Sequence, residues 1–240
     1  MNETVLIIGA TSSLAQAICR QLAQQGYALI LAGRDAEELE LLAADLTTRH
    51  NSATAILIAD FLNVDFSAEQ LIHDAGAFDH IIIATGDMGD PDPTNPNNIA
   101  YTIWLNYTVP AQIATLAALH LAATGKGTIT LISSVAGDRG RQSNYAYGSA
   151  KAALTTFASG LRNRLYKEGI HVMTVKPGFI DTPLTWGMQS PLIASREYAA
   201  GCIVRAMQKR KNVIYVPFFW RYIMLIIIHI PEKIFKRLSL

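Results

Sequence analysis

The sequence predicts an α/β fold in which helices cover both faces of one parallel, seven-stranded sheet. Short apolar runs alternate along the chain with segments of helical periodicity, the order that βαβ units produce. Half of the 240 residues are hydrophobic, enough for a sizeable core without disulfides. We expect strands at 4–8, 28–32, 54–59, 79–84, 127–133, 170–175 and 213–216, and helices at 13–25, 36–49, 67–75, 99–123, 146–168 and 196–209.

Each of these elements follows from its local pattern. The strand segments are short and rich in Ile, Val and Leu, whereas the segments between them are longer and repeat apolar residues every three or four positions. Asp35, followed by Glu37 and Glu38, is expected to cap the second helix. Because no change in composition marks a second domain, we interpret 1–216 as one domain and 217–240 as an apolar and basic C-terminal helical extension.

Composition and charge exclude several classes of protein. The formal net charge of +1 gives no reason to expect a nucleic-acid partner. The two cysteines, Cys19 and Cys202, lack the spacing of metal ligands, and no metal is expected. The N-terminal residues contain no basic segment before a hydrophobic one, so we expect a cytoplasmic protein.

Two connections differ from the others. Residues 87–98 are acidic and rich in proline, and residues 179–195 carry Pro183, Gly187 and Pro191. Both follow strands on the side where open parallel sheets bind their ligands. We therefore interpret both as candidate walls or lids of a binding site, the alternative being ordinary surface connections.

The turn after the first strand is a candidate phosphate-binding site. A strand leads through small residues into a helix N-terminus, where main-chain N–H groups and the helix dipole favour an anion. The glycine spacing is imperfect, because Ser13 and Ala15 stand where glycines are expected. The candidate contacts are Gly9, Thr11, Ser12, Ser13 and Leu14.

The ends of the next strands suggest how the rest of a dinucleotide is held. Gly33 occupies the tip of the second strand, where an acidic residue would favour NAD(H), and Arg34 follows it with a guanidinium suited to a 2′-phosphate. NADP(H) is therefore favoured over NAD(H). Further along, Asp60 and Phe61 are placed near an adenine, and Ala84 and Gly86 offer a smooth main-chain surface.

A catalytic pair is predicted in the segment 147–151. Tyr147 and Lys151 are four residues apart and so lie on one face of a helix, where the ammonium is expected to lower the pKa of the phenol toward working pH. Ser134 ends a strand upstream, and Asn106 lies on the preceding helix. Pro177, Gly178, Ile180 and Thr182 follow the sixth strand, where they could contact a nicotinamide carboxamide.

Taken in order, these elements resemble the short-chain dehydrogenase/reductase family over residues 4–216. The resemblance implies a doubly wound Rossmann fold and hydride transfer to or from a nicotinamide. It also implies that Ser134 polarises the substrate carbonyl, Tyr147 exchanges the proton, Lys151 tunes Tyr147 and binds ribose, and Asn106 supports the proton relay. Dimers or tetramers are usual in this family, so a homo-oligomer is expected.

Several stretches are similar to one branch of that family, the decaprenylphosphoryl-2-keto-ribose reductases. They are 9–12, 106–108, 136–139 with 147–149, and 221–235, the last of which lies outside the core fold. The similarity implies a keto-sugar on a polyprenyl phosphate, reduced at the inner face of the membrane. A different glycolipid, an unrelated ketone or a non-catalytic nucleotide-binding scaffold remains an alternative, although a scaffold has no need for an activated phenol.

The C-terminal extension gives a further clue. Residues 218–230 are almost continuously apolar, but they are too short for a spanning helix of roughly 20 residues and contain Arg221 and His229. With Lys233, Lys236 and Arg237 they suit a helix lying in the interface of an anionic leaflet. We favour contact with a membrane surface or a partner subunit through residues 218–240 over packing against the core.

Overall fold

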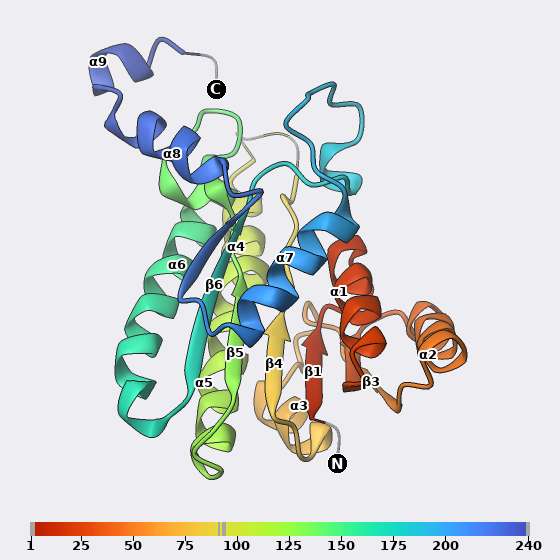
Figure 1. Ribbon diagram of the computed structural model, residues 1–240. Coiled ribbons are helices and arrows are strands. Elements are labelled where there is room, and N and C mark those ends of the chain that lie inside the picture. The colour runs from red at the N-terminus through yellow and green to blue at the C-terminus, as the bar shows by residue number, and fades with distance from the viewer. Residues whose placement is uncertain (1–2, 91, 93–94, 239–240) are drawn as a thin grey trace.

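The computed structural model describes residues 3–90, 92 and 95–238. Residues 91, 93 and 94 of the predicted loop 87–98 lie outside the described residues, as do the ends of the predicted domain and extension at 1–2 and 239–240. Within the described part, one seven-stranded parallel sheet carries helices on both faces (Figure 1), which confirms the predicted fold class.

The sheet has the strand order β3-β2-β1-β4-β5-β6-β7, and every pair is parallel. The chain therefore starts at the centre, builds outward to β3, and crosses back to lay β4 beside β1. Where the direction of building reverses, the carboxyl ends of β1 and β4 leave a crevice that suits a ligand. The strands are β1 (Thr4–Ile8), β2 (Ala28–Gly33), β3 (Thr54–Ile58), β4 (His80–Ile83), β5 (Thr128–Ile132), β6 (His171–Pro177) and β7 (Val213–Val216).

Helices pack on both faces of this sheet and form two separate cores. One core joins α1, α2 and α7 to the sheet, and the other joins α3, α5 and α6 to its opposite face. The helices are α1 (Ser13–Gln24), α2 (Ala36–His50), α3 (Ala68–Ala75), α4 (Asn97–Ile103), α5 (Val109–Ala122), α6 (Tyr145–Leu165), α7 (Arg196–Gln208), α8 (Trp220–His229) and α9 (Glu232–Phe235).

The long helix predicted at 99–123 contains a local change of geometry. Between α4 and α5, residues Trp104–Thr108 form a π-helical segment in which the Val109 N–H bonds to the Trp104 carbonyl five residues back. Pro110 explains this change, because it has no N–H to donate to the Asn106 carbonyl and its ring would collide with that carbonyl in a regular α-helix. Short π segments of this kind are frequent at functional sites.

The C-terminal extension forms α8 and α9 at the carboxyl-end edge of the sheet (Figure 1). The inner face of α8 buries Trp220 and Met224 against the domain, and α9 buries Phe235. Internal packing, the less favoured interpretation of the sequence, is therefore correct for this inner face. No helix in the described part of the chain is long and apolar enough to cross a membrane.

Candidate active site

Two adjoining cavities of about 490 and 190 Å³ lie at the carboxyl ends of the strands and share Thr11, Ser12 and Arg34 in their linings. Every residue that the sequence suggested for cofactor contact lines one or both cavities. These residues are Gly9, Thr11, Ser12, Ser13, Leu14, Arg34, Asp60, Phe61, Ala84, Gly86, Tyr147, Lys151, Pro177, Gly178, Ile180 and Thr182. Ser134 lines the larger cavity as well, together with residues of both predicted wall loops.

The first turn is shaped to lie close to a ligand. Gly9 has φ +77°, and a Cβ there would come within 3.0 Å of the Ala84 carbonyl oxygen on the neighbouring strand. Ser12 caps α1, since its hydroxyl accepts a hydrogen bond from the Ala15 N–H at 3.3 Å. Ala15 is fully buried beneath the turn. A methyl group at the expected glycine position is therefore accommodated inside the protein, and it leaves the cavity free.

A second glycine and a buried hydroxyl complete the surface that a dinucleotide would meet. Gly86 has φ +140°, and a Cβ there would approach Asn106 Oδ1 to 2.3 Å and Lys151 Nζ to 2.9 Å. Thr85 lines both cavities, and its Oγ1 is buried with no hydrogen-bond partner among the described residues. A hydroxyl in this position lacks the partner that buried polar groups normally have, and a bound molecule could supply it.

Arg34 and Asp60 occupy the outer end of the paired cavities. Arg34 is exposed, lines both cavities and forms no ion pair within the described residues. Asp35 caps α2 as predicted, because its Oδ1 accepts from the Glu38 N–H at 3.0 Å. Asp60 lines the smaller cavity and accepts from the Leu62 N–H at 3.0 Å. Arg34 is thus a free guanidinium at the position where a 2′-phosphate is expected.

Tyr147 and Ser134 meet at the inner end of the larger cavity. The first turn of α6 presents Tyr147, and Ser134 follows β5. Burial raises the pKa of Tyr147 to about 12, and a side-chain hydrogen bond with Ser134 opposes this rise. The expected lowering of the Tyr147 pKa is therefore wrong for the protein alone, because the cost of burying a phenolate dominates.

The surroundings of the Lys151 side chain explain why its ammonium does not lower the pKa of Tyr147. The side chain is buried, and Nζ donates to the main-chain carbonyls of Ile132 at 3.1 Å and Thr85 at 3.4 Å. Lys151 Nζ lies 5.6 Å from the centroid of the Tyr147 ring. Burial lowers the pKa of Lys151 to about 8, partly offset by Asp87. The result is a cation at the cavity floor that exchanges protons near neutral pH.

Asn106 is placed differently from the other predicted catalytic residues. It is fully buried in the π-helical segment and lines neither cavity. Its Nδ2 donates to the Asp87 carbonyl at 2.8 Å and to the Thr102 carbonyl at 3.0 Å. Asn106 therefore supports the floor of the site from behind, by holding the chain that follows β4.

Asp87 was predicted only as the first residue of the wall loop 87–98, and not as a catalytic or cofactor-binding residue. It lines both cavities, accepts a 2.5 Å hydrogen bond from the Tyr101 hydroxyl, and acts electrostatically on Tyr147 and Lys151. The available sequence signal was its place directly after Gly86 at a strand end. Its partners Tyr101, Tyr147 and Lys151 lie 14, 60 and 64 residues further along the chain and become visible only in the folded protein.

A third cavity of about 350 Å³ lies on the other side of Tyr147, between the loop after β4 and the start of α6. Its lining combines apolar surface with the polar side chains of Asp90, Asn98, Ser143 and Asn144, and Asn144 Oδ1 is buried without a partner in the described part of the chain. The lining residues are Met88, Gly89, Asp90, Asn98, Ser143, Asn144, Tyr145, Ala146 and Tyr147. This cavity can receive a polar molecule beside the phenol.

The C-terminal extension is fastened to the turn that follows Ser134. Arg139 Nη1 donates to the carbonyls of Ile228 at 2.9 Å and Ile230 at 2.8 Å, which closes the C-terminal end of α8. The same guanidinium lies 4.0 Å over the Phe235 ring and pairs with Glu232 at 2.8 Å. The extension is thus a fixed wall next to the site.

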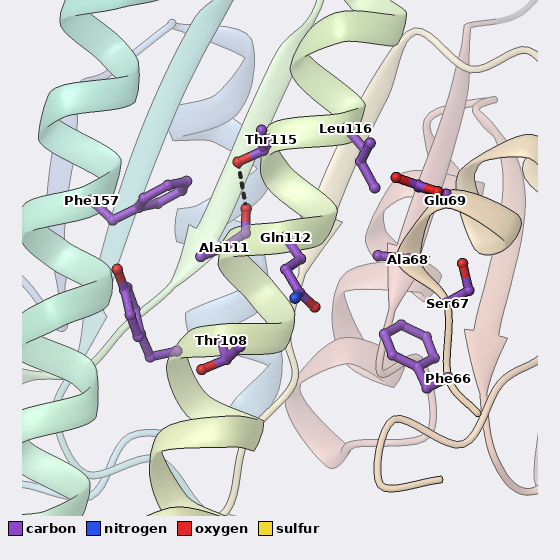
Figure 2. Close-up of a pocket in the computed structure, with 11 residues that line it drawn as sticks. Phe66, Ser67, Ala68, Glu69, Thr108, Ala111, Gln112, Thr115, Leu116 and Phe157 are labelled. Carbon is purple, nitrogen blue, oxygen red and sulfur yellow. Dashed lines mark hydrogen bonds between the residues drawn. The ribbon is translucent and has the colours of Figure 1, made fainter. Parts of the chain in front are cut away.

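A larger cavity of about 580 Å³ lies away from this site, among α3, α5 and α6 (Figure 2). None of the predicted site residues lines it. Its walls include Phe66, Ser67, Glu69, Gln112 and Phe157. Within the described residues, no cluster of three His, Cys, Asp or Glu side chains could hold a metal ion.

Comparison with known proteins is consistent with this geometry. The model of the short chain dehydrogenase family matches residues 3–192. An uncharacterized oxidoreductase of Mycobacterium tuberculosis is 31% identical over 242 residues, covering 98% of this chain and 96% of its own. An uncharacterized oxidoreductase of Streptomyces coelicolor is 30% identical over 241 residues, covering 98% and 96%.

Solved structures share the fold. A bulky-bulky ketone specific alcohol dehydrogenase from Comamonas testosteroni superposes with a TM-score of 0.81 at 23% identity, covering 96% of this chain and 95% of its own. A short-chain dehydrogenase from Sphingobium yanoikuyae in complex with NADPH gives a TM-score of 0.80 at 24% identity, covering 96% and 97%. At these identities the likeness establishes the fold alone.

Proposed function

This chain belongs to the short chain dehydrogenase family, and on that premise we propose that it reduces a ketone to an alcohol with a nicotinamide cofactor. One observation carries the proposal. Two hydroxyls, those of Ser134 and Tyr147, meet beside the buried ammonium of Lys151 in the cavity that begins at the Gly9 turn. A proton donor, a carbonyl-polarising hydroxyl and a dinucleotide-sized crevice are thus combined at one place.

The residues present fit such a cofactor. The Gly9 and Gly86 surfaces have no room for side chains of their own, and Thr85 Oγ1 is left for a bound molecule to satisfy. The N-terminus of α1 would hold the pyrophosphate, and Pro177 and Gly178 would contact the carboxamide. Arg34 and the absence of an acid at Gly33 favour NADP(H) over NAD(H).

When bound, the reduced nicotinamide supplies a hydride to the carbonyl carbon. The Ser134 hydroxyl donates a hydrogen bond to the carbonyl oxygen, and Tyr147 transfers its proton to that oxygen as negative charge develops there. Because the pKa of Tyr147 is raised to about 12, the phenol is protonated at neutral pH and ready to donate. An alkoxide is more basic than a phenolate, so the transfer is favourable.

Tyr147 then has to recover a proton. Lys151 Nζ lies 5.6 Å from the centroid of the Tyr147 ring, and the Lys151 pKa of about 8 makes the ammonium a usable proton source near neutral pH. Asn106 supports this relay by fixing the main chain at Asp87, next to Lys151. The catalytic residues in this proposal are Ser134, Tyr147 and Lys151, with Asn106 as a positioning residue.

The proposed substrate is a keto-sugar carried on a polyprenyl phosphate, as in the decaprenylphosphoryl-2-keto-ribose reductase branch. The cavity beside Tyr147 has the polar side chains of Asp90, Asn98 and Asn144 in its walls, which supports a polyhydroxylated substrate. The extension 217–240 supports a lipid carrier, through contact of residues 218–240 with a membrane surface or a partner subunit. A homo-oligomer that works in the cytoplasm, at the inner face of the membrane, completes the proposal.

The test is consumption of NADPH or NADH by the purified protein with extracted polyprenyl-phosphate keto-sugars and with simple ketones. We expect turnover with NADPH, and Tyr147→Phe should abolish it while cofactor binding, followed by fluorescence titration, stays within about twofold. Tyr166→Phe, at an exposed tyrosine beyond the end of α6, is the matched control. Near wild-type turnover by Tyr147→Phe would show that the assigned proton donor is wrong.

A further inference from the structure

The outer face of α8 is largely apolar, although no residue that the structure describes covers it. The inner face packs Trp220 and Met224 against the domain, but Tyr222, Leu225 and Ile226 on the outer face are 60, 54 and 68% exposed. Arg221 and His229 are the only strongly polar residues of α8, and an apolar helix face of this kind is ordinarily buried. This outer face therefore has the composition of a surface that another phase or molecule covers.

The apolar surface continues beyond α8 in both directions along the same edge of the molecule. Phe218 precedes the helix, and Ile234 and Leu238 follow it, all with exposed side chains. The loop after β6 packs Phe179 and Leu192 against α8 and exposes Leu184, Trp186 and Met188. Leu184 also lines the cavity of about 490 Å³ in the candidate active site. Both segments lie at the carboxyl-end edge of the sheet (Figure 1), the edge at which the cavity of the candidate active site also lies.

The charge of the extension indicates which kind of surface it contacts. The extension holds four basic residues, Arg221, Lys233, Lys236 and Arg237, and one acidic residue, Glu232. All four basic side chains are exposed and form no ion pair within the described residues, while Glu232 is already paired with Arg139. An apolar face with aromatic residues and flanking cations matches the interface of an anionic leaflet.

The attachment of α8 gives this surface a fixed orientation. Arg139 holds the C-terminal end of the helix through main-chain carbonyls. The N-terminal end packs closely on the turn at Gly178, because a Cβ at Gly178 would come within 2.0 Å of Trp220 Nε1. The helix is thus fixed against the domain along its inner face. A membrane contact through its outer face would therefore hold the whole domain in one orientation.

We propose that the outer face of α8, the basic residues that follow it and the loop tip at Leu184, Trp186 and Met188 form one docking surface for an anionic lipid leaflet, which turns the entrance of the site toward the lipid. This proposal rests on the proposed function, because it explains how the site meets a lipid-linked ketone. It commits to the lipid surface, and a protein partner on the same face is an outcome of the test.

The experiment is flotation of the full-length protein with vesicles of phosphatidylcholine alone or with 30% phosphatidylglycerol. We expect binding to the anionic vesicles, weakening as salt rises. Leu225→Glu/Ile226→Glu and Lys233→Glu/Lys236→Glu/Arg237→Glu should each lower the bound fraction at least tenfold. Val64→Glu, at a highly exposed apolar residue outside this surface, is the matched control and should bind normally.

Fluorescence tests the loop tip separately. Trp186 is 79% exposed whereas Trp220 is buried, so a blue shift on adding anionic vesicles, absent in Trp186→Phe, reports lipid contact at the loop. Absence of binding, or equal binding to both vesicle types, would overturn the proposal. So would an α8 variant that floats normally but changes the oligomeric state, since the face would then be a protein interface.

The same variants separate this proposal from the proposed function. Tyr147→Phe should float like the wild-type protein. The Leu225→Glu/Ile226→Glu variant and the Lys233→Glu/Lys236→Glu/Arg237→Glu variant should both retain turnover of a water-soluble ketone. If no ketone is reduced but vesicle binding behaves as expected, the proposed function fails and the docking surface stands. If ketones are reduced and no vesicle binds, the docking surface alone is overturned.

Discussion

Lys176 Nζ and Asp138 Oδ1 approach to 2.5 Å, with only 10% of each side chain exposed. The other carboxylate oxygen of Asp138 accepts a 2.8 Å hydrogen bond from the Tyr215 hydroxyl, whose pKa is raised by burial and by this carboxylate. Asp138 belongs to the turn after Ser134, and Lys176 immediately precedes Pro177. The ion pair therefore ties two walls of the proposed site together from behind.

Breaking this pair on one side should destabilise the protein strongly. Asp138→Asn leaves the Lys176 ammonium without its carboxylate in a nearly buried position, at an expected cost of about 3 kcal/mol in the free energy of unfolding. Urea denaturation measures it. The double variant Asp138→Asn/Lys176→Met should lose less than the sum of the single variants, because no unpaired charge is left.

The control for this prediction is an exposed ion pair. Asp45 pairs with Arg20 and Arg49 on the surface, and Asp45→Asn should cost about 0.5 kcal/mol. If the two aspartate variants lose the same free energy, burial does not distinguish the Asp138 pair.

Lys151 should make the stability of the protein depend on pH. Its pKa is about 8 in the folded protein and near its ordinary value of 10.5 in the unfolded chain. Between these values the unfolded chain binds the proton more tightly, so the free energy of unfolding rises with pH. Lys151→Met removes this rise. Between pH 8 and 10, the free energy of unfolding of the wild-type protein should therefore increase by about 2 kcal/mol more than that of the variant.

Urea denaturation of both proteins at pH 7, 8, 9 and 10 provides the measurement. The difference between the two curves isolates Lys151, because all other titrating groups are shared. The Tyr147 pKa, raised to about 12, affects stability above pH 10 and in the opposite direction, outside this window. Parallel curves from pH 7 to 10 would mean that the ammonium is not buried as described.

The secondary structure was predictable because local patterns decide it. Each strand is a run of apolar residues bounded by turn residues, and Asp35 caps α2 where its position relative to Glu37 and Glu38 predicted. The π-helical segment was not predicted. Pro110 is compatible with a helix start at 109 as well as with a π turn, so the residue type alone does not predict which of the two forms.

The site was predictable in its membership and not in its electrostatics. The parallel sheet brings every strand end to one edge, so residues that follow strands, such as Thr11, Arg34 and Gly86, had to gather there. The sign of the Tyr147 pKa shift depends on burial and on the partners that Lys151 selects, here the carbonyls of Ile132 and Thr85. No spacing in the sequence reports these quantities.

Gly86 should tolerate no side chain. Gly86→Ala combines φ +140°, a backbone conformation that alanine rarely adopts, with a Cβ only 2.3 Å from Asn106 Oδ1. We expect a loss of about 3 kcal/mol or more in the free energy of unfolding, and weaker cofactor binding because Asn106 and Lys151 are displaced. Gly125→Ala also has a positive φ, +66°, in the left-handed helical region, but open space around it, and should cost about 1 kcal/mol. Equal losses in the two variants would show that the contact at Asn106 contributes nothing.

Arg34 should decide which dinucleotide the protein prefers. Its guanidinium is exposed, has no ion pair in the described part of the chain, and lines both cavities at the outer end. Arg34→Ser should weaken NADPH binding about tenfold, because one charge-assisted contact to a phosphate is lost. NADH binding should stay nearly unchanged. Fluorescence titration of each cofactor gives both constants, and Arg20→Ser, on the outer surface of α1, is the control for a lost arginine. If Arg34→Ser weakens both cofactors equally, the arginine contacts a part that they share, and the preference for NADP(H) has to come from elsewhere.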